Sequence, residues 1–252
     1  MARYKLQVAG HDELLKIDGK LLKPVNTHEQ KFYLDSVNTE IENVIPKNFG
    51  LYTKIKPQDE RKSILIWFLD FIILEDLLEE YCDPCVMDIK IGKRLYGKGA
   101  SQRKREKMIH QSESTTSGSF GYRLCGMRKP FGESVKNYTK ADGKQYSIEE
   151  LNQTLKEFFQ FPNSTDSINI FVSKLDEIIN IVSRTQLRLY SCSLLFFCEK
   201  DGSRPEIRII DFAHSFFNNQ MGTDENFLLG ARNLSSVLHS FQFDKTVQES
   251  AK

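Results

Sequence analysis

Two charged residues, Asp88 and Lys90, lie two positions apart in an otherwise apolar stretch, residues 84–92 (PCVMDIKIG). Apolar and β-branched residues of this kind favour a β-strand, and residues two apart on a strand point to the same face. The acid and the base therefore project side by side, while the residues between them enter a core. Such charges are costly unless they serve each other or a ligand. The pair is thus either a structural ion pair or part of a binding site.

The residues that follow this pair are strongly basic. Positions 90–107 hold eight Lys and Arg and one acid, whereas the whole chain has 35 Lys and Arg, 34 Asp and Glu and a net charge of +1. The positive charge is therefore local, which predicts a pocket for a small, highly anionic ligand and argues against a general nucleic-acid or membrane binder. The candidate ligand-binding cations are Lys90, Lys93, Arg94, Lys98, Arg103, Lys104 and Lys107.

Part of this basic segment, about residues 101–111, is predicted to be a helix. Arg103 and Lys104 lie in its first turn, and Lys107 falls in the same sector. Cations near a helix N-terminus oppose the macrodipole, but clustered phosphates would make the arrangement favourable. A solvated charged helix usually alternates its signs, and this one does not. We therefore expect residues 94–119 to bind the anionic substrate, with 112–119 as a mobile polar linker.

Three further charged residues have types and positions suited to phosphoryl transfer, which needs a phosphate-binding cation and a metal-holding carboxylate. Lys23 on a strand and Glu29 in the next helix resemble the pair that positions ATP phosphates in protein kinases, or are a pair of solvated surface charges. Asp211 ends an apolar strand and either caps it or holds Mg²⁺. Asp211-Phe212-Ala213 also resembles the metal-binding Asp-Phe-Gly of protein kinases.

Three separated motifs together resemble the inositol polyphosphate kinase family. They occur in the family's order as P-x-x-x-D-x-K-x-G at 84–92, SCSLL at 191–195 and IDFAH at 210–214. Any one of them is a weak signal, but three in order are a strong one. The segment from Ala100 to Met127 resembles the hexakisphosphate kinase branch of the family most closely.

The resemblance implies ATP and Mg²⁺ as cofactors and a role for each candidate residue. Lys23 would contact the ATP phosphates and Asp211 the metal. Asp88 would accept hydrogen bonds from the ribose, and the backbone of Glu75 and Leu77 would hold the adenine. The remaining implied roles concern the substrate: Lys90 would contact the transferred phosphate and the acceptor, and His214 would make a polar contact.

The sequence leaves the acceptor of the phosphate open. We expect inositol hexakisphosphate, which would become diphosphoinositol pentakisphosphate, with lower inositol phosphates as further substrates. A phosphate acceptor is already anionic and needs no general base, and the chain has no equivalent of the His-Arg-Asp loop of protein kinases. The nearest alternative is a multikinase or trisphosphate 3-kinase acting on ring hydroxyls. A non-catalytic inositol phosphate receptor and a nucleic-acid-binding protein are more distant alternatives.

The predicted elements favour an α+β, bilobal fold that is protein-kinase-like or ATP-grasp-like. Residues 1–77 would form an antiparallel β-rich N-lobe with a hinge at 75–77, and residues 78–252 a larger mixed C-lobe. The signals are a hairpin turn at Asp18-Gly19, capping boxes at 27–30 and 147–150, and helical stripes in 148–159, 171–182 and 227–241. We expect a cytoplasmic or nuclear monomer that binds small molecules, without nucleic-acid or membrane partners.

Overall fold

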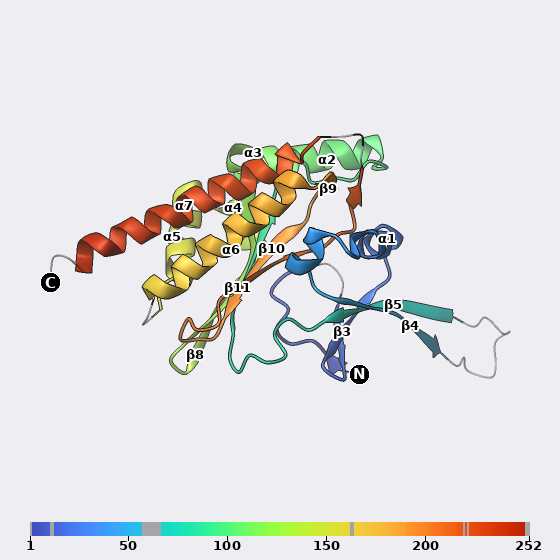
Figure 1. Ribbon diagram of the computed structural model, residues 1–252, viewed down its shortest axis with the longest axis horizontal. Coiled ribbons are helices and arrows are strands. Elements are labelled where there is room, and N and C mark those ends of the chain that lie inside the picture. The colour runs from blue at the N-terminus through green and yellow to red at the C-terminus, as the bar shows by residue number, and fades with distance from the viewer. Residues whose placement is uncertain are drawn as a thin grey trace.

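The computed structural model describes residues 2–10, 13–56, 67–161, 164–218, 220 and 222–249. Two five-stranded sheets and a two-stranded one are present in this part of the chain, and every strand pairing in them is antiparallel. Figure 1 shows the first sheet beneath α1, and the second beside the long helices α6 and α7. The combination of helices and antiparallel sheets is the predicted α+β class.

All strands of the first sheet come from the first 75 residues. Their spatial order is β1 (Ala2–Arg3), β2 (Leu15–Ile17), β3 (Lys20–Pro24), β5 (Trp67–Glu75) and β4 (Asn48–Lys56). Asp18 and Gly19, with φ of 45° and 71°, form the predicted tight turn between β2 and β3. A 3-10 turn, η1 (Glu40–Val44), and helix α1 (Thr27–Ser36) lie between β3 and β4. The cap of α1 is Asn26, one residue earlier than predicted, because its side chain accepts the backbone N–H groups of His28 and Glu29.

The second sheet holds the stretch on which the sequence analysis opened. Its order is β11 (Glu206–Ile210), β10 (Ser193–Cys198), β6 (Cys85–Ile91), β7 (Tyr122–Phe131) and β8 (Ser134–Tyr138). Met87, Ile89 and Ile91 on the central strand β6 are fully buried, as the alternation predicts. Two short strands, β9 (Leu187–Leu189) and β12 (Ser215–Phe217), pair separately.

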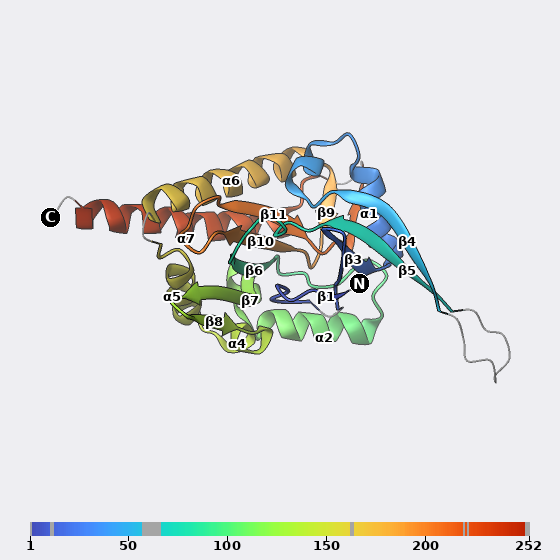
Figure 2. The ribbon, with the colours of Figure 1, turned by 90° about the horizontal axis from the view of Figure 1, so that it is seen from below.

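The helices that follow β6 in the chain pack against the second sheet, except α2, which contacts α3 and extends beyond the sheet (Figure 2). They are α2 (Gln102–Glu113), α3 (Thr116–Phe120), α4 (Lys140–Gln145), α5 (Ile148–Phe158), α6 (Ser164–Arg184) and α7 (Glu225–Glu249). The predicted apolar stripes are buried: Leu155 and Phe158 on α5, Phe171 and Leu175 on α6, and Leu234 on α7 are each 0% exposed. One hydrophobic cluster joins these helices to both large sheets.

The prediction of a mobile linker at 112–119 is wrong. The segment contains the end of α2 and most of α3, and the side chains of Ser112, Thr116 and Ser117 are buried. Gly118 makes the close packing possible, because a Cβ there would lie 2.6 Å from the carbonyl oxygen of Ser112. Polar composition alone does not reveal this contact. The apolar sequence of residues 64–74 also predicts a buried strand; β5 contains residues 67–74, and residues 64–66 lie outside the described residues.

Candidate functional site

A cavity of about 520 Å³ is lined by residues of both large sheets and of the helices α1 and α2. Most of the predicted site residues contribute to it, although they are far apart in the sequence. Those that line the cavity are Lys23, Glu29, Glu75, Leu77, Asp88, Lys90, Lys104, Lys107, Asp211 and His214.

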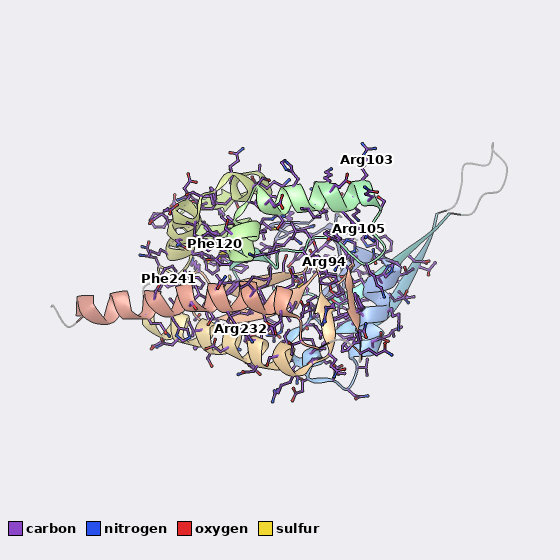
Figure 3. All side chains as sticks on the ribbon, turned by 90° about the horizontal axis from the view of Figure 1, so that it is seen from above. Arg94, Arg103, Arg105, Phe120, Arg232 and Phe241 are labelled. Atoms are coloured by element: carbon purple, nitrogen blue, oxygen red, sulfur yellow. The ribbon has the colours of Figure 1, made fainter. Side chains whose placement is uncertain are left out.

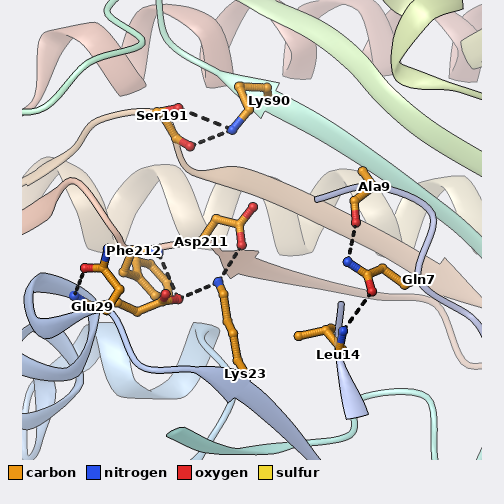
Figure 4. Close-up of polar contacts among 10 residues, drawn as sticks. Gln7, Ala9, Leu14, Lys23, Glu29, Lys90, Ser191, Asp211 and Phe212 are labelled. Carbon is orange, nitrogen blue, oxygen red and sulfur yellow. Dashed lines mark hydrogen bonds and ion pairs between the residues drawn. The ribbon is translucent and has the colours of Figure 1, made fainter. Parts of the chain in front are cut away.

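Lys23 joins two carboxylates that line this cavity with it (Figure 4). Its Nζ lies 2.8 Å from Glu29 Oε1 and 2.8 Å from Asp211 Oδ1. Glu29 is 1% exposed and also accepts the backbone N–H of Phe212, at 3.2 Å. Burial lowers the pKa of Lys23, but the two carboxylates more than offset this and raise the pKa overall. The pair of Lys23 and Glu29 is therefore a buried ion pair and not a pair of solvated surface charges.

Asp211 reaches the cavity through an unusual backbone conformation. Its φ is 68°, a region that costs a non-glycine residue about 1–3 kcal/mol and is common at functional sites. The next residue, Phe212, is fully buried and stacks on Phe32 with ring centroids 4.3 Å apart. This anchored ring holds the chain after β11 so that the carboxylate of Asp211 meets Lys23.

The surroundings of Asp211 are compatible with a Mg²⁺ ion that takes most of its ligands from elsewhere. Among the described residues, no group of three or more His, Cys, Asp or Glu could hold a metal. Mg²⁺ commonly takes one or two protein carboxylates and completes its shell with water and nucleotide phosphates. The side chain of Asp211 is 36% exposed at the cavity, so it could serve as such a carboxylate.

Asp88 and Lys90 both face the cavity, but no ion pair joins them in the described part of the chain. Lys90 Nζ donates to the carbonyl oxygen of Ser191, at 2.6 Å, and contacts its Oγ at 3.4 Å (Figure 4). An ammonium group has three donors, so it retains capacity for a phosphate. Burial, followed by the charge of Asp211, raises the pKa of Asp88 to about 6. The alternative of a structural ion pair is therefore wrong.

The basic segment divides into residues that line the cavity and residues that do not. Lys104 and Lys107 share one face of α2 with Met108 and Gln111, and this face lines the cavity. Arg103 points away from the body of the protein at the outer end of α2 (Figure 3). The predicted cations that do not line the cavity are Lys93, Arg94, Lys98 and Arg103.

Arg94 has a different set of contacts from the one predicted. Its guanidinium carbon lies 4.7 Å from the ring centroid of Tyr96 and 4.1 Å from that of Tyr190. Its Nε donates to the carbonyl oxygen of Tyr96, and Nη1 contacts the hydroxyl of Tyr190 at 3.4 Å. These contacts connect the loop after β6 to the segment before β10. Arg94 therefore stabilises these two segments against each other and does not line the cavity.

His214, by contrast, lines the cavity as predicted. Burial, together with the nearby charge of Lys104, lowers its pKa. A neutral imidazole there can accept or donate a hydrogen bond without adding to the positive charge.

Several residues of the cavity were not predicted from the sequence. Arg123 on β7 is 1% exposed and stands opposite Lys90 in the β6–β7 register. A charged residue between the apolar Tyr122 and Leu124 repeats the pattern of Asp88 and Lys90, so the same reasoning could have found it. The other unpredicted cations are Lys140 and Lys144, which lie on the short helix α4.

The N-terminal segment also reaches the cavity, although no motif or periodicity in it predicted this. Gln7 lines the cavity, and its side chain closes the local loop by donating to the carbonyl oxygen of Ala9 and accepting the N–H of Leu14 (Figure 4). Val8 then crosses to the second sheet. A Cβ on Gly126 of β7 would lie 2.1 Å from the carbonyl oxygen of Val8, so only glycine permits this approach.

Comparisons with known proteins point to one family. The family model for inositol polyphosphate kinase matches residues 71–239. The inositol polyphosphate multikinase of Schizosaccharomyces pombe is 31% identical over 94% of this chain and 96% of its own length. The inositol hexakisphosphate kinase 3 of Mus musculus is 25% identical over 74% of this chain, which spans only 52% of that protein.

The fold is also similar to that of solved structures. A crystal structure of the inositol phosphate multikinase of S. cerevisiae, in complex with ADP and Mn²⁺, matches with a TM-score of 0.75 and 26% identity. The match covers 88% of this chain and 98% of the yeast chain. A second inositol phosphate multikinase structure matches with a TM-score of 0.68 and 25% identity.

Proposed function

This chain belongs to the inositol polyphosphate kinase family, and on that premise we propose that it transfers the γ-phosphate of ATP to a free hydroxyl of an inositol polyphosphate. The observation that carries the proposal is the cavity itself. It unites the Lys23–Asp211 ion pair, suited to a nucleotide and its metal, with the cations Lys90, Lys104 and Lys107, suited to a polyanion. Phosphoryl transfer depends mainly on such positioning and charge stabilisation.

Each group in the cavity has a task in this proposal. Lys23 would contact the ATP phosphates while Glu29 keeps its ammonium in place. Asp211 would hold the Mg²⁺, which supplies charge neutralisation between the phosphates when bound. Lys90 would use its remaining donor capacity on the transferred phosphate, since its hydrogen bonds within the described residues go to Ser191. Lys104 and Lys107 would bind phosphates of the inositol ring.

A hydroxyl acceptor is better supported than the hexakisphosphate acceptor that the motifs suggested. The fission yeast multikinase aligns with nearly the whole of this chain and is itself covered over 96% of its length. The mouse hexakisphosphate kinase aligns at lower identity and over about half of its own length. A loose transition state also allows a hydroxyl to attack without a strong general base.

Inositol hexakisphosphate is the second candidate substrate, because the alignment with the mouse hexakisphosphate kinase still includes 74% of this chain. The two acceptors give different products, a phosphomonoester and a diphosphate, which ³¹P NMR distinguishes. We expect monoester products from inositol tris- and tetrakisphosphates in the presence of ATP and Mg²⁺. Turnover with hexakisphosphate alone would refute the hydroxyl acceptor, and Asp211→Asn serves as the inactive control.

A further inference from the structure

The short helix α4 contributes a second group of cations to the cavity, separate from those of α2. Lys140 and Lys144 are four residues apart, so they lie on one face of the helix, and both line the cavity. Figure 2 shows α4 beyond the C-terminal end of α2. The cationic lining therefore continues from one helix to the next along the cavity.

Two local features fix the position of α4. Its N-terminus carries a capping box, in which Asp142 Oδ2 accepts the backbone N–H of Thr139 at 2.6 Å and its hydroxyl at 2.8 Å. The only acid of the helix is thereby used at the cap. Gly143 then packs against β7, since a Cβ on it would lie 2.1 Å from the carbonyl oxygen of Leu124. That oxygen belongs to the backbone and cannot rotate away, so any side chain here would push α4 outward.

The surroundings of α4 are positively charged. Arg123, next to Leu124 on β7, has its Nε and Nη1 buried without a hydrogen-bond partner in the described part of the chain. Burial lowers the pKa of Lys140, and the charges of Arg123 and Lys90 lower it further. Like charges brought together in this way repel each other, and an anionic ligand between them removes the cost.

The carboxylates that line the cavity are fewer than its lining Lys and Arg residues. Those that line it are Glu29, Glu75, Asp88 and Asp211. Glu29 and Asp211 are bonded to Lys23, and Glu75 accepts the backbone N–H of Lys47. Asp88 is buried on β6, and with a pKa raised to about 6 it remains mostly ionised at neutral pH.

We propose that Lys140 and Lys144, held against β7 by Gly143, form a second phosphate-binding group that makes the enzyme favour inositol phosphates with more phosphates over those with fewer. The inference rests on the proposed function and deepens it by naming the substrate class. The cations of α2 and Lys90 engage the phosphates nearest the acceptor, and the cations of α4 engage those farther along the ring. An inositol phosphate with few phosphates gains little from α4.

The direct test is the double variant Lys140→Gln/Lys144→Gln. We expect its kcat/KM for an inositol pentakisphosphate with a free hydroxyl to fall at least about tenfold, because two charge-assisted contacts are lost. For an inositol trisphosphate the fall stays within about threefold, and the KM for ATP is unchanged. Lys136→Gln is the matched control, since this exposed lysine on β8 is paired with Glu157 and does not line the cavity. An equal loss for both substrates would overturn the inference.

Gly143→Ala tests the position of α4 without changing any charge. We expect it to reduce the preference for the pentakisphosphate as the double variant does, while the melting temperature establishes that the protein still folds. If Gly143→Ala does not fold, the double variant alone decides, because its substitutions are on the helix surface and half-buried at most.

Calorimetric titration with inositol hexakisphosphate in the absence of ATP gives a readout that does not depend on turnover. We expect affinity and its salt dependence to fall in the double variant and to stay unchanged in Lys136→Gln. Unchanged affinity in the double variant would overturn the role of α4. A wild-type protein that binds hexakisphosphate through α4 but phosphorylates no inositol phosphate would overturn the proposed function instead.

Discussion

Replacing Lys23 by methionine would remove the charge that holds two carboxylates together. Its Nζ lies 2.8 Å from both Glu29 Oε1 and Asp211 Oδ1. Glu29 is 1% exposed, and its carboxylate would keep the N–H of Phe212 as its partner among the residues that the structure describes. Breaking a buried pair on one side typically costs about 3–5 kcal/mol. Asp211 is 36% exposed and adds little, because solvent screens its charge. We therefore expect the free energy of unfolding to fall by about 3 kcal/mol.

Urea denaturation followed by circular dichroism measures this change. The second variant, Lys23→Met/Glu29→Gln, removes the stranded charge as well, so it should recover at least about half of the lost stability. Lys31→Met is the matched control, because Lys31 forms an exposed pair with Asp35 one helical turn away and should cost at most about 0.5 kcal/mol.

The two outcomes separate a structural role of Lys23 from a catalytic one. A loss below about 1 kcal/mol in Lys23→Met would contradict the buried-pair argument, since the cost of an uncompensated carboxylate would be missing. Recovery of stability without recovery of activity in the double variant would show that Lys23 also acts on the nucleotide.

Three more outcomes are expected. Asp211→Asn should lower kcat at least about a hundredfold in a radiometric ATP assay. Its melting temperature should stay within a few degrees of the wild-type value, because asparagine also tolerates a positive φ. Normal turnover in this variant would remove Asp211 from the mechanism. The pKa of Asp88 is raised from 3.8 to about 6, so Asp88 stabilises the folded state most below pH 3.8, and about 3 kcal/mol of this stability is lost as the pH rises through 6. The urea midpoint should therefore be lower at pH 7 than at pH 4 in the wild type, and this difference should be absent in Asp88→Asn. Lys104→Ala should raise the KM for the inositol phosphate about tenfold and leave the KM for ATP unchanged. Arg103 is its neighbour outside the cavity, so Arg103→Ala should change neither KM. An equal rise of the inositol phosphate KM in both variants would mean that α2 acts only through its net charge.

The local periodicity of the sequence determined where the main catalytic candidates point. Alternation along β6 placed Asp88 and Lys90 on one face, with Ile89 and its neighbours in the core, because side chains on a strand alternate whatever the strand contacts. The sequence also indicated Lys23 and Glu29 as a pair, but it left open whether the pair is solvated, and the tertiary structure decided that Glu29 is buried. Three ordered motifs also pointed to the family, although they favoured the hexakisphosphate branch that the alignments support less well.

Contacts between distant parts of the chain decided the rest. Asp211 contacts Lys23 although the two residues are 188 positions apart. Arg94 was predicted to bind the ligand, but its guanidinium instead stacks on Tyr190, a residue of a distant segment. Lys140 joins the cavity only because Gly143 fits against β7. Residue types and spacing describe one element at a time, so they predict which face a side chain occupies. The element that this face meets depends on packing and charge pairing over the whole molecule, which only the tertiary structure determines.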